Sequence, residues 1–122
     1  MARGTDRFRV ILLVEDEWVV RDVLASELRN AGWQVIEAST AEGALALLET
    51  RQRIDLLLTD IQLAGHLSGW DVAERYRVAR ADLPVIYACN NSADRSRSVQ
   101  GSVLFDKPYD VVQVVKACSR YL

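Results

Sequence analysis

Residues 54–62 read Ile54-Asp55-Leu56-Leu57-Leu58-Thr59-Asp60-Ile61-Gln62. This run is short and mostly apolar, and the turn-rich segment 64–69 follows it. Such a run is typical of a strand in a parallel sheet, where both faces of the strand are buried. Open α/β sheets bind their ligands at the carboxyl ends of the strands. We therefore expect Asp60 to lie at the ligand-binding edge of a sheet.

The rest of the chain alternates strand-like and helix-like patterns around this run. Apolar runs of strand length occupy residues 8–14, 33–38, 54–60, 85–89 and 102–105. Apolar residues at helical spacing occupy residues 18–31, 41–48, 72–79 and 109–122. Residues 90–100 hold few apolar side chains, so we expect only a short or frayed helix there.

This alternation predicts the α/β class, with a doubly wound five-stranded parallel sheet in the order 2-1-3-4-5 and helices on both faces, as in flavodoxin-like folds. We expect one domain over residues 1–122, with residues 1–7 as a flexible N-terminal extension. Gly32 is placed to end the first helix, and Ser39 or Thr40 to cap the second. Pro108 suits the entry of the last helix.

Composition narrows the functional classes. The 122 residues include 15 Lys and Arg against 17 Asp and Glu, a balance that disfavours binding to nucleic acid or to anionic membranes. No apolar run approaches the roughly 18 residues of a membrane span, so we expect a soluble cytoplasmic protein. The two cysteines are expected to be free thiols in a reducing compartment. Trp18, Trp33 and Trp70 are interpreted as covering the core rather than as partner anchors.

Charged residues gather where the predicted strands end. Glu15 and Asp16 follow the first strand, Asp60 ends the third, and Lys107 follows the fifth. In the order 2-1-3-4-5 the first and third strands flank the switch point, so their carboxylates are expected to meet. Clustered carboxylates repel one another unless a cation or a proton intervenes. Mg²⁺ prefers oxygen ligands of this kind, so we expect a magnesium site.

This cluster suggests phosphoryl chemistry. An aspartate carboxylate can attack phosphorus and form an acyl phosphate. Asp60 is therefore the expected nucleophile. Phosphoryl transfer needs positive charge on the equatorial oxygens, which Mg²⁺ and Lys107 are placed to supply.

Five short motifs lie at these strand ends in the same order along the chain. They are Val14-Glu15-Asp16-Glu17, Thr59-Asp60-Ile61, Gly69-Trp70-Asp71, Leu83-Pro84-Val85-Ile86 and Lys107-Pro108. Together they make nearly the whole chain resemble the receiver domain of two-component response regulators.

The resemblance implies that Asp60 accepts a phosphoryl group from a phosphohistidine on a histidine kinase or a histidine phosphotransfer protein. The acceptor then switches a protein–protein interaction with a downstream target. It implies that Asp16, Asp60 and the backbone carbonyl of Gln62 bind Mg²⁺ with help from Glu15, while Lys107 contacts the phosphoryl oxygens. It implies a signalling domain rather than a turnover enzyme, and it allows a dimer that depends on phosphorylation.

The chain departs from the family pattern at two switch positions. Cys89 stands where the family usually has Thr or Ser, and a thiol is a weak hydrogen-bond donor. Leu104 stands where the family often carries an aromatic residue. These departures leave open an alternative, a pseudo-receiver or adaptor that binds partners with weak or no phosphorylation-dependent switching. A small phosphatase is disfavoured, because its second acid would stand at Gln62.

Overall fold

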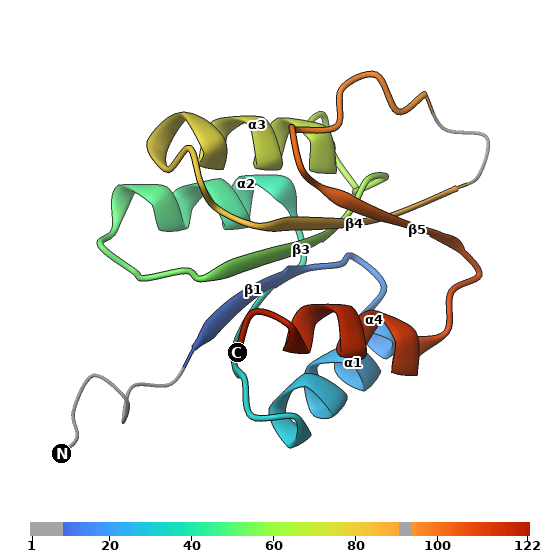
Figure 1. Ribbon diagram of the computed structural model, residues 1–122. Coiled ribbons are helices and arrows are strands. Elements are labelled where there is room, and N and C mark those ends of the chain that lie inside the picture. Colours follow the sequence, from blue (N-terminus) through green and yellow to red (C-terminus); the bar gives the residue numbers. More distant parts are fainter. Residues whose placement is uncertain (1–8, 91–93) are drawn as a thin grey trace, which may run out of the picture.

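Five parallel strands form one sheet in the order β2-β1-β3-β4-β5 (Figure 1). The computed structural model describes residues 9–90 and 94–122, so the expected extension over residues 1–7 lies outside the described residues. The strands are β1 (Val10–Val14), β2 (Gln34–Ala38), β3 (Leu56–Asp60), β4 (Val85–Asn90) and β5 (Val103–Lys107). The predicted sheet and its strand order are confirmed.

Helices cover both faces of this sheet (Figure 1). They are α1 (Trp18–Asn30), α2 (Ala41–Ala46), which continues as the 3-10 turn η2 (Leu47–Glu49), α3 (Gly69–Ala79) and α4 (Val111–Ser119). One apolar cluster joins α2 and α3 to the sheet, and a second joins α1 and α4 to the opposite face. No helix in the described part of the chain has the length and apolar character needed to cross a membrane.

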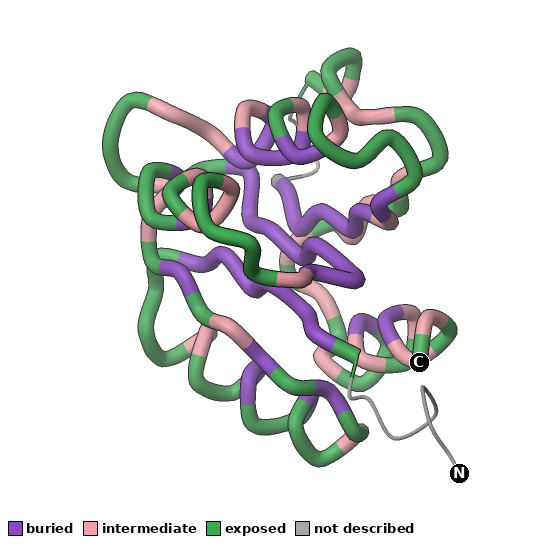
Figure 2. The backbone as a smooth tube through the Cα atoms, turned by 90° about the vertical axis from the view of Figure 1, so that its left-hand side faces the viewer, coloured by how far each residue is buried: buried purple, intermediate pink, exposed green. Residues whose placement is uncertain are grey.

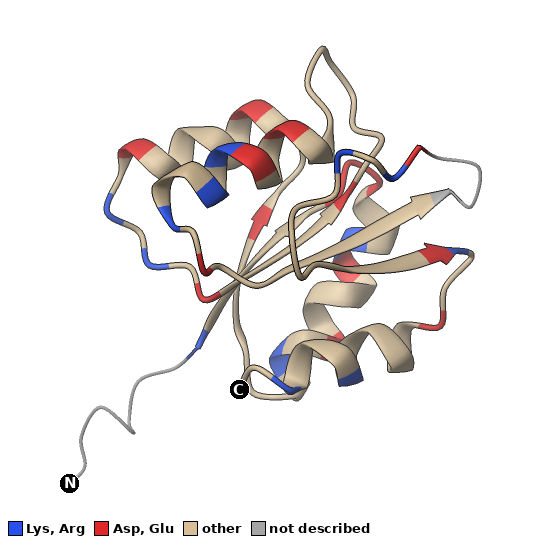
Figure 3. Ribbon diagram, turned by 45° about the horizontal axis from the view of Figure 1, so that its top comes forward, with Lys and Arg blue, Asp and Glu red and all other residues tan. Residues whose placement is uncertain are grey.

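The central strands are buried because each has a neighbour on both sides and helices above and below. All five residues of β1 and all five of β3 are buried, and Figure 2 shows continuous buried stretches along the strands. The strands β3 and β5 carry charge only toward their carboxyl ends, which is visible in Figure 3. Burial therefore holds the strands in place, while the charged residues of β3 and β5 lie at the carboxyl ends of these strands.

Side chains that bond to the backbone decide where the helices begin. Gly32 has a φ of 109° just after α1, as its predicted role requires. The Thr40 side chain, of the two candidates, accepts a hydrogen bond from the Gly43 N–H at 2.9 Å and caps α2. The helix entry predicted at Pro108 is wrong. Asp110 accepts the Val112 N–H at 2.9 Å, so α4 begins at Val111.

Residues 94–102, named here the crossover segment, contain turns instead of the short helix expected between β4 and β5. The Ser98 N–H donates to the Arg95 carbonyl oxygen at 3.0 Å, and the Ser102 N–H donates to that of Val99 at 3.1 Å. Too few apolar side chains are present to give a helix a buried face. Residues 91–93 lie outside the described residues.

The helical spacing over residues 109–122 predicts that Val111, Val115, Cys118 and Leu122 lie inward. Cys118 is buried, as is Val114, whereas Leu122 is 47% exposed, so its predicted inward position is wrong. The reason is that α4 ends at Ser119, and Leu122 lies beyond the helical periodicity.

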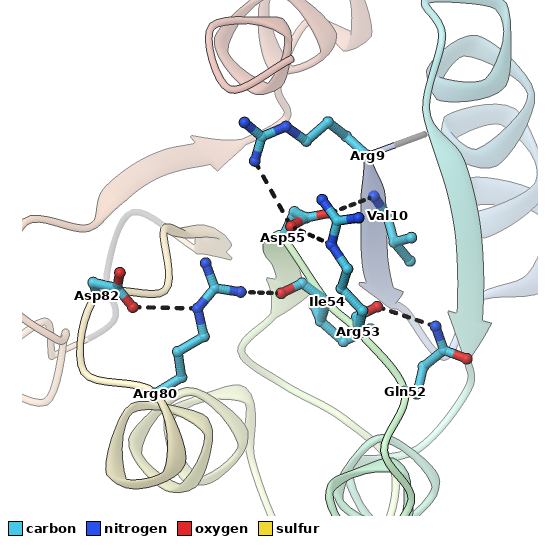
Figure 4. Close-up of polar contacts among 8 residues, drawn as sticks. All are labelled: Arg9, Val10, Gln52, Arg53, Ile54, Asp55, Arg80 and Asp82. Atoms are coloured by element: carbon cyan, nitrogen blue, oxygen red, sulfur yellow. Dashed lines mark hydrogen bonds and ion pairs between the residues drawn. The ribbon is translucent and has the colours of Figure 1, made fainter. Parts of the chain in front are cut away.

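Polar contacts close the opposite, amino-terminal edge of the sheet (Figure 4). The buried carboxylate of Asp55 accepts the Val10 N–H at 2.9 Å, and the Asp55 N–H donates to the Val10 carbonyl oxygen at 2.7 Å. The same carboxylate accepts Nε–H of Arg53 at 3.0 Å. Arg80 donates to the Ile54 carbonyl oxygen from the end of α3. These contacts fix how β1 and β3 enter the sheet.

Candidate functional site

Three carboxylates and one lysine meet at the carboxyl edge of the sheet. Glu15 and Asp16 directly follow β1, Asp60 ends β3, and Lys107 ends β5. One oxygen from each of the three carboxylates lies within 4.8 Å of the others. Glu15 and Asp60 are only 2% and 5% exposed, whereas Asp16 is open to solvent. The structure thus brings together the four side chains that the sequence placed at this edge.

Lys107 binds Asp60 directly. Its Nζ lies 2.6 Å from Oδ2 of Asp60, within the range of a strong charge-assisted hydrogen bond. Burial lowers the pKa of Lys107, but the hydrogen bond to Asp60 and the negative charges of Asp60, Glu15 and Glu17 raise it on balance. The amine therefore stays protonated beside the carboxylate.

The charged form of Glu15 is disfavoured by its surroundings. Burial raises its pKa from 4.5 to about 7, and the charge of Asp60 adds to this effect. The Glu17 N–H, which donates to Glu15 Oε2 at 3.1 Å, and the charge of Lys107 act in the opposite direction. Three acids face one lysine at this edge, so full ionisation of the acids leaves negative charge in excess.

A bound cation would offset this negative charge, and the donor atoms decide which cation fits. The donor set consists of hard carboxylate oxygens from two adjacent loops, and one of the three acids is open to solvent. A small divalent cation such as Mg²⁺ prefers these donors and keeps several water ligands, which an open side would admit. The residues present therefore fit Mg²⁺.

A cavity of about 330 Å³ opens over this cluster. It is lined by Asp16, Glu17, Asp60, Gln62, Leu63, Ala64 and Lys107. Gln62 thus lies beside Asp60, as its predicted place required. Cys89 is absent from the described residues that line this cavity. It is fully buried in the apolar cluster beneath α2 and α3, and it pairs with Asp106 in the register of β4 and β5.

The close approach of α3 to Asp60 was missed by sequence reasoning. The Gly69 N–H donates to the Ile61 carbonyl oxygen at 2.8 Å. A Cβ atom on Gly69 would lie 2.0 Å from the Asp60 carbonyl oxygen, so only glycine fits at this position. The glycine was visible as part of a motif, but its reason is a tertiary distance.

Arg21 is a second residue that no sequence signal identified. Its guanidinium donates to the Glu15 carbonyl oxygen at 2.8 Å, and it also pairs with Glu37 on β2 at 3.3 Å. Arg21 therefore holds the backbone of the acidic loop against the edge of the sheet.

An apolar groove of about 550 Å³ adjoins the acidic cavity. Glu17 and Lys107 line both hollows, and the rest of the groove is lined by Val19, Val20, Val23, Pro108, Tyr109 and Val111. Trp33 and Trp70 are buried as expected, but Trp18 is 69% exposed, so its predicted core role is wrong. Trp18 opens α1, whose apolar residues turn partly outward beside the acids.

The chain is similar to known proteins over most of its length. A model of the response regulator receiver domain matches residues 11–118. The probable transcriptional regulatory protein TcrX of Mycobacterium tuberculosis is 29% identical over 119 residues, which cover 94% of this chain and 50% of that protein. Sporulation initiation phosphotransferase F of Bacillus subtilis is 28% identical over 116 residues, 92% of each chain. The chain spans about half the length of several of these curated relatives.

Solved structures show the same arrangement. A response regulator receiver protein from Sinorhizobium medicae superposes with a TM-score of 0.88 at 29% identity, covering 94% of both chains. The response regulator TrrA of Thermotoga maritima, solved in complex with Mg(2+)-BeF, superposes with a TM-score of 0.81 at 26% identity. That match covers 94% of this chain and 100% of the other.

Proposed function

The chain belongs to the response regulator receiver domain family, a family of signalling domains, and on this premise we propose that Asp60 is its phosphoacceptor. The phosphoryl donor is a phosphohistidine. One observation carries the proposal: the buried Asp60 carboxylate lies 2.6 Å from Lys107 Nζ and within 4.8 Å of the two acids that follow β1.

The transfer exchanges one bond for another at phosphorus. An oxygen of the Asp60 carboxylate attacks, an O–P bond forms, and the N–P bond to the donor imidazole breaks, with the electron pair returning to the ring nitrogen. The product is an acyl phosphate on Asp60. Lys107 is protonated and already touches the attacking carboxylate, so its charge is in place for the phosphoryl oxygens.

Glu15, Asp16, Asp60 and the backbone carbonyl of Gln62 are the groups that would hold Mg²⁺. When bound, the ion supplies positive charge for the phosphoryl oxygens and offsets the repulsion among the acids. Support comes from the acidic cluster itself and from the Mg(2+)-BeF complex of TrrA, whose chain is 26% identical to this one. In this chain Arg21 contributes by holding the Glu15 backbone.

The donor is a histidine kinase or a histidine phosphotransfer protein. Family membership implies the kinase as a partner. To bring a phosphohistidine to Asp60, such a protein must cover the surface around the acidic cavity. The exposed Trp18 and the apolar groove beside Lys107 offer that surface.

No observation favours the pseudo-receiver alternative. Cys89 and Leu104 lie outside the acidic cavity. The proposed acceptor Asp60 lies together with the acids proposed to assist it. The alternative concerns the response to phosphorylation rather than the acceptance of phosphate.

The test is phosphorylation with acetyl phosphate and Mg²⁺, read by mass spectrometry of the intact chain. We expect a mass increase of one phosphoryl group that disappears in Asp60→Asn and when EDTA removes the metal. Asp82→Asn is the matched control, because Asp82 is exposed, pairs with Arg80 and does not line the acidic cavity. Equal labelling of Asp60→Asn and the unsubstituted chain would overturn the proposal.

A further inference from the structure

The crossover segment 94–102 has little packing of its own beyond Val99, which is partly buried against the apolar cluster beneath α2 and α3, and side chains from other elements also hold it. None of its residues is buried, and its internal hydrogen bonds are those of turns. Segments of this kind belong to the less stable parts of a fold and move when their anchors move. Its position therefore depends on the contacts that reach it from neighbouring elements.

The first of these contacts joins Arg97 to α3. The Arg97 Nη2 lies 2.9 Å from Asp71 Oδ1 and 2.7 Å from Glu74 Oε1, and its Nε donates to Glu74 Oε2 at 3.1 Å. Asp71 also accepts the Ser68 N–H at 2.7 Å in the capping box that begins α3. That backbone hydrogen bond, followed by the contact with Arg97, lowers the pKa of Asp71. Arg97 thus binds the first turn of α3 through Asp71 and the second turn through Glu74.

The second contact reaches the same turn from inside the core. Tyr87 on β4 is fully buried, and its hydroxyl accepts the Val99 N–H at 3.2 Å. The ring of Tyr87 packs on Trp70, with centroids 4.7 Å apart and planes at 59°. The hydrogen bond to Val99 and the ring contact connect the crossover segment to the residue that follows Gly69.

This turn of α3 rests directly on the backbone of Asp60. A Cβ atom on Gly69 would lie 2.0 Å from the Asp60 carbonyl oxygen, and the Gly69 N–H donates to the Ile61 carbonyl oxygen. Close-packed contacts of this kind transmit displacement rather than absorb it.

We propose that the first turn of α3 reports the phosphorylation state of Asp60 to the crossover segment, and that Tyr87 and Arg97 are the positioning residues that couple them. The inference rests on the proposed phosphoacceptor role of Asp60. A change in the Asp60 backbone moves Gly69, and Trp70 and Asp71 move with it. The crossover segment follows because its two outside anchors to this turn are the Tyr87 hydroxyl and the Arg97 guanidinium.

The test is amide NMR of the full chain with and without Mg²⁺ and beryllofluoride. In the unsubstituted chain we expect shifts both in residues of the acidic cavity and in Ser98, Val99 and Gly101. Tyr87→Phe removes only the hydroxyl, and Arg97→Gln removes the charge together with the guanidinium donors that reach Asp71 and Glu74. Each is expected to keep the response of the acidic cavity and at least to halve the response of the crossover segment.

Arg95→Gln is the matched control, because Arg95 lies in the same segment but pairs with Asp106 on β5. It should respond as the unsubstituted chain does. A full response of the crossover segment in both Tyr87→Phe and Arg97→Gln would overturn the coupling alone. So would a silent segment in an unsubstituted chain whose acidic cavity responds. If the acidic cavity itself does not respond, the phosphoacceptor role fails, and the coupling fails with it.

Discussion

Lys107 Nζ lies 2.6 Å from Asp60 Oδ2, so the residue that ends β5 is bonded to the residue that ends β3 across the intervening strand β4. No ladder of backbone hydrogen bonds joins these two strands. The ion pair is therefore a link across the sheet, and it places the positive charge of Lys107 against one of the three clustered acids.

Replacing Lys107 by Met should expose the repulsion among those acids. We expect the free energy of unfolding to fall by about 1–3 kcal/mol without divalent cations, because a buried carboxylate loses its partner. Mg²⁺ should restore part of the loss. Urea unfolding with and without Mg²⁺ measures both effects. Lys116→Met, at an exposed position on α4, should change stability by less than about 0.5 kcal/mol. Equal effects of the two substitutions would contradict this account.

The raised pKa of Glu15 predicts a specific pH dependence. A carboxyl whose pKa is higher in the folded chain than in the unfolded chain stabilises the fold where it is protonated, and the contribution is lost as pH rises from 4.5 through about 7. The loss is on the order of 3 kcal/mol. Unfolding measured across this window without metal should show the decline, and Glu15→Gln should flatten it. Parallel curves for the two chains would refute the assignment.

Gly69→Ala should be severe because its methyl group meets backbone. A Cβ 2.0 Å from the Asp60 carbonyl oxygen must push α3 away, and overpacking of this kind costs about 1–3 kcal/mol or more. Acetyl phosphate labelling of Asp60 should slow as well. Gly101→Ala isolates backbone strain, since Gly101 has a φ of 77° and nothing within 4 Å of its Cβ position. It should cost about 1 kcal/mol without slowing labelling.

Asp55→Ala tests the amino-terminal edge of the sheet. It leaves the Val10 N–H without its side-chain acceptor and Arg53 without its carboxylate, so we expect a loss of about 1–3 kcal/mol in the free energy of unfolding. Asp82→Ala removes an exposed ion pair and should cost less than about 1 kcal/mol. Phosphorylation of Asp60 should remain in both chains. A loss for Asp55→Ala no larger than that for Asp82→Ala would show that the contacts of Asp55 do not stabilise this edge.

Trp18→Ala separates docking of the donor from chemistry at Asp60. Trp18 is exposed and directly follows Glu17, which lines both the acidic cavity and the groove, so it is suited to be a binding hot spot, where truncation costs more than about 1 kcal/mol. Transfer from a phosphorylated histidine phosphotransfer protein should therefore slow by about fivefold or more. Labelling by acetyl phosphate should be unchanged. Val78→Ala, which is 89% exposed on α3, is the control for both reactions.

The sheet and its acidic edge could be predicted because both follow from short-range patterns. Runs such as 54–60 mark buried strands, and parallel strands bring their carboxyl ends to one edge, so Asp60 and Lys107 had to meet Glu15 and Asp16. Periodicity failed where apolar residues became scarce, in the crossover segment. It failed again where a side chain overrode a composition signal, as Asp110 did at the start of α4.

What the sequence could not reveal depends on distances between elements. The contact of Gly69 with the Asp60 backbone and the bond from Arg21 to the Glu15 carbonyl oxygen join segments that no local pattern relates. Tyr87 looked like an ordinary strand residue, and only its hydroxyl bond to Val99 gives it a further role.

The hydrogen bonds between Asp55 and Val10 make the amino ends of the strands different in kind from their carboxyl ends. At the amino end, the backbone groups of Val10 and Asp55 and the buried Asp55 carboxylate are joined to one another by hydrogen bonds. At the carboxyl end, like charges are kept together against their repulsion. The same two strands, β1 and β3, are thus held firmly by hydrogen bonds at their amino ends and carry repelling charges at their carboxyl ends.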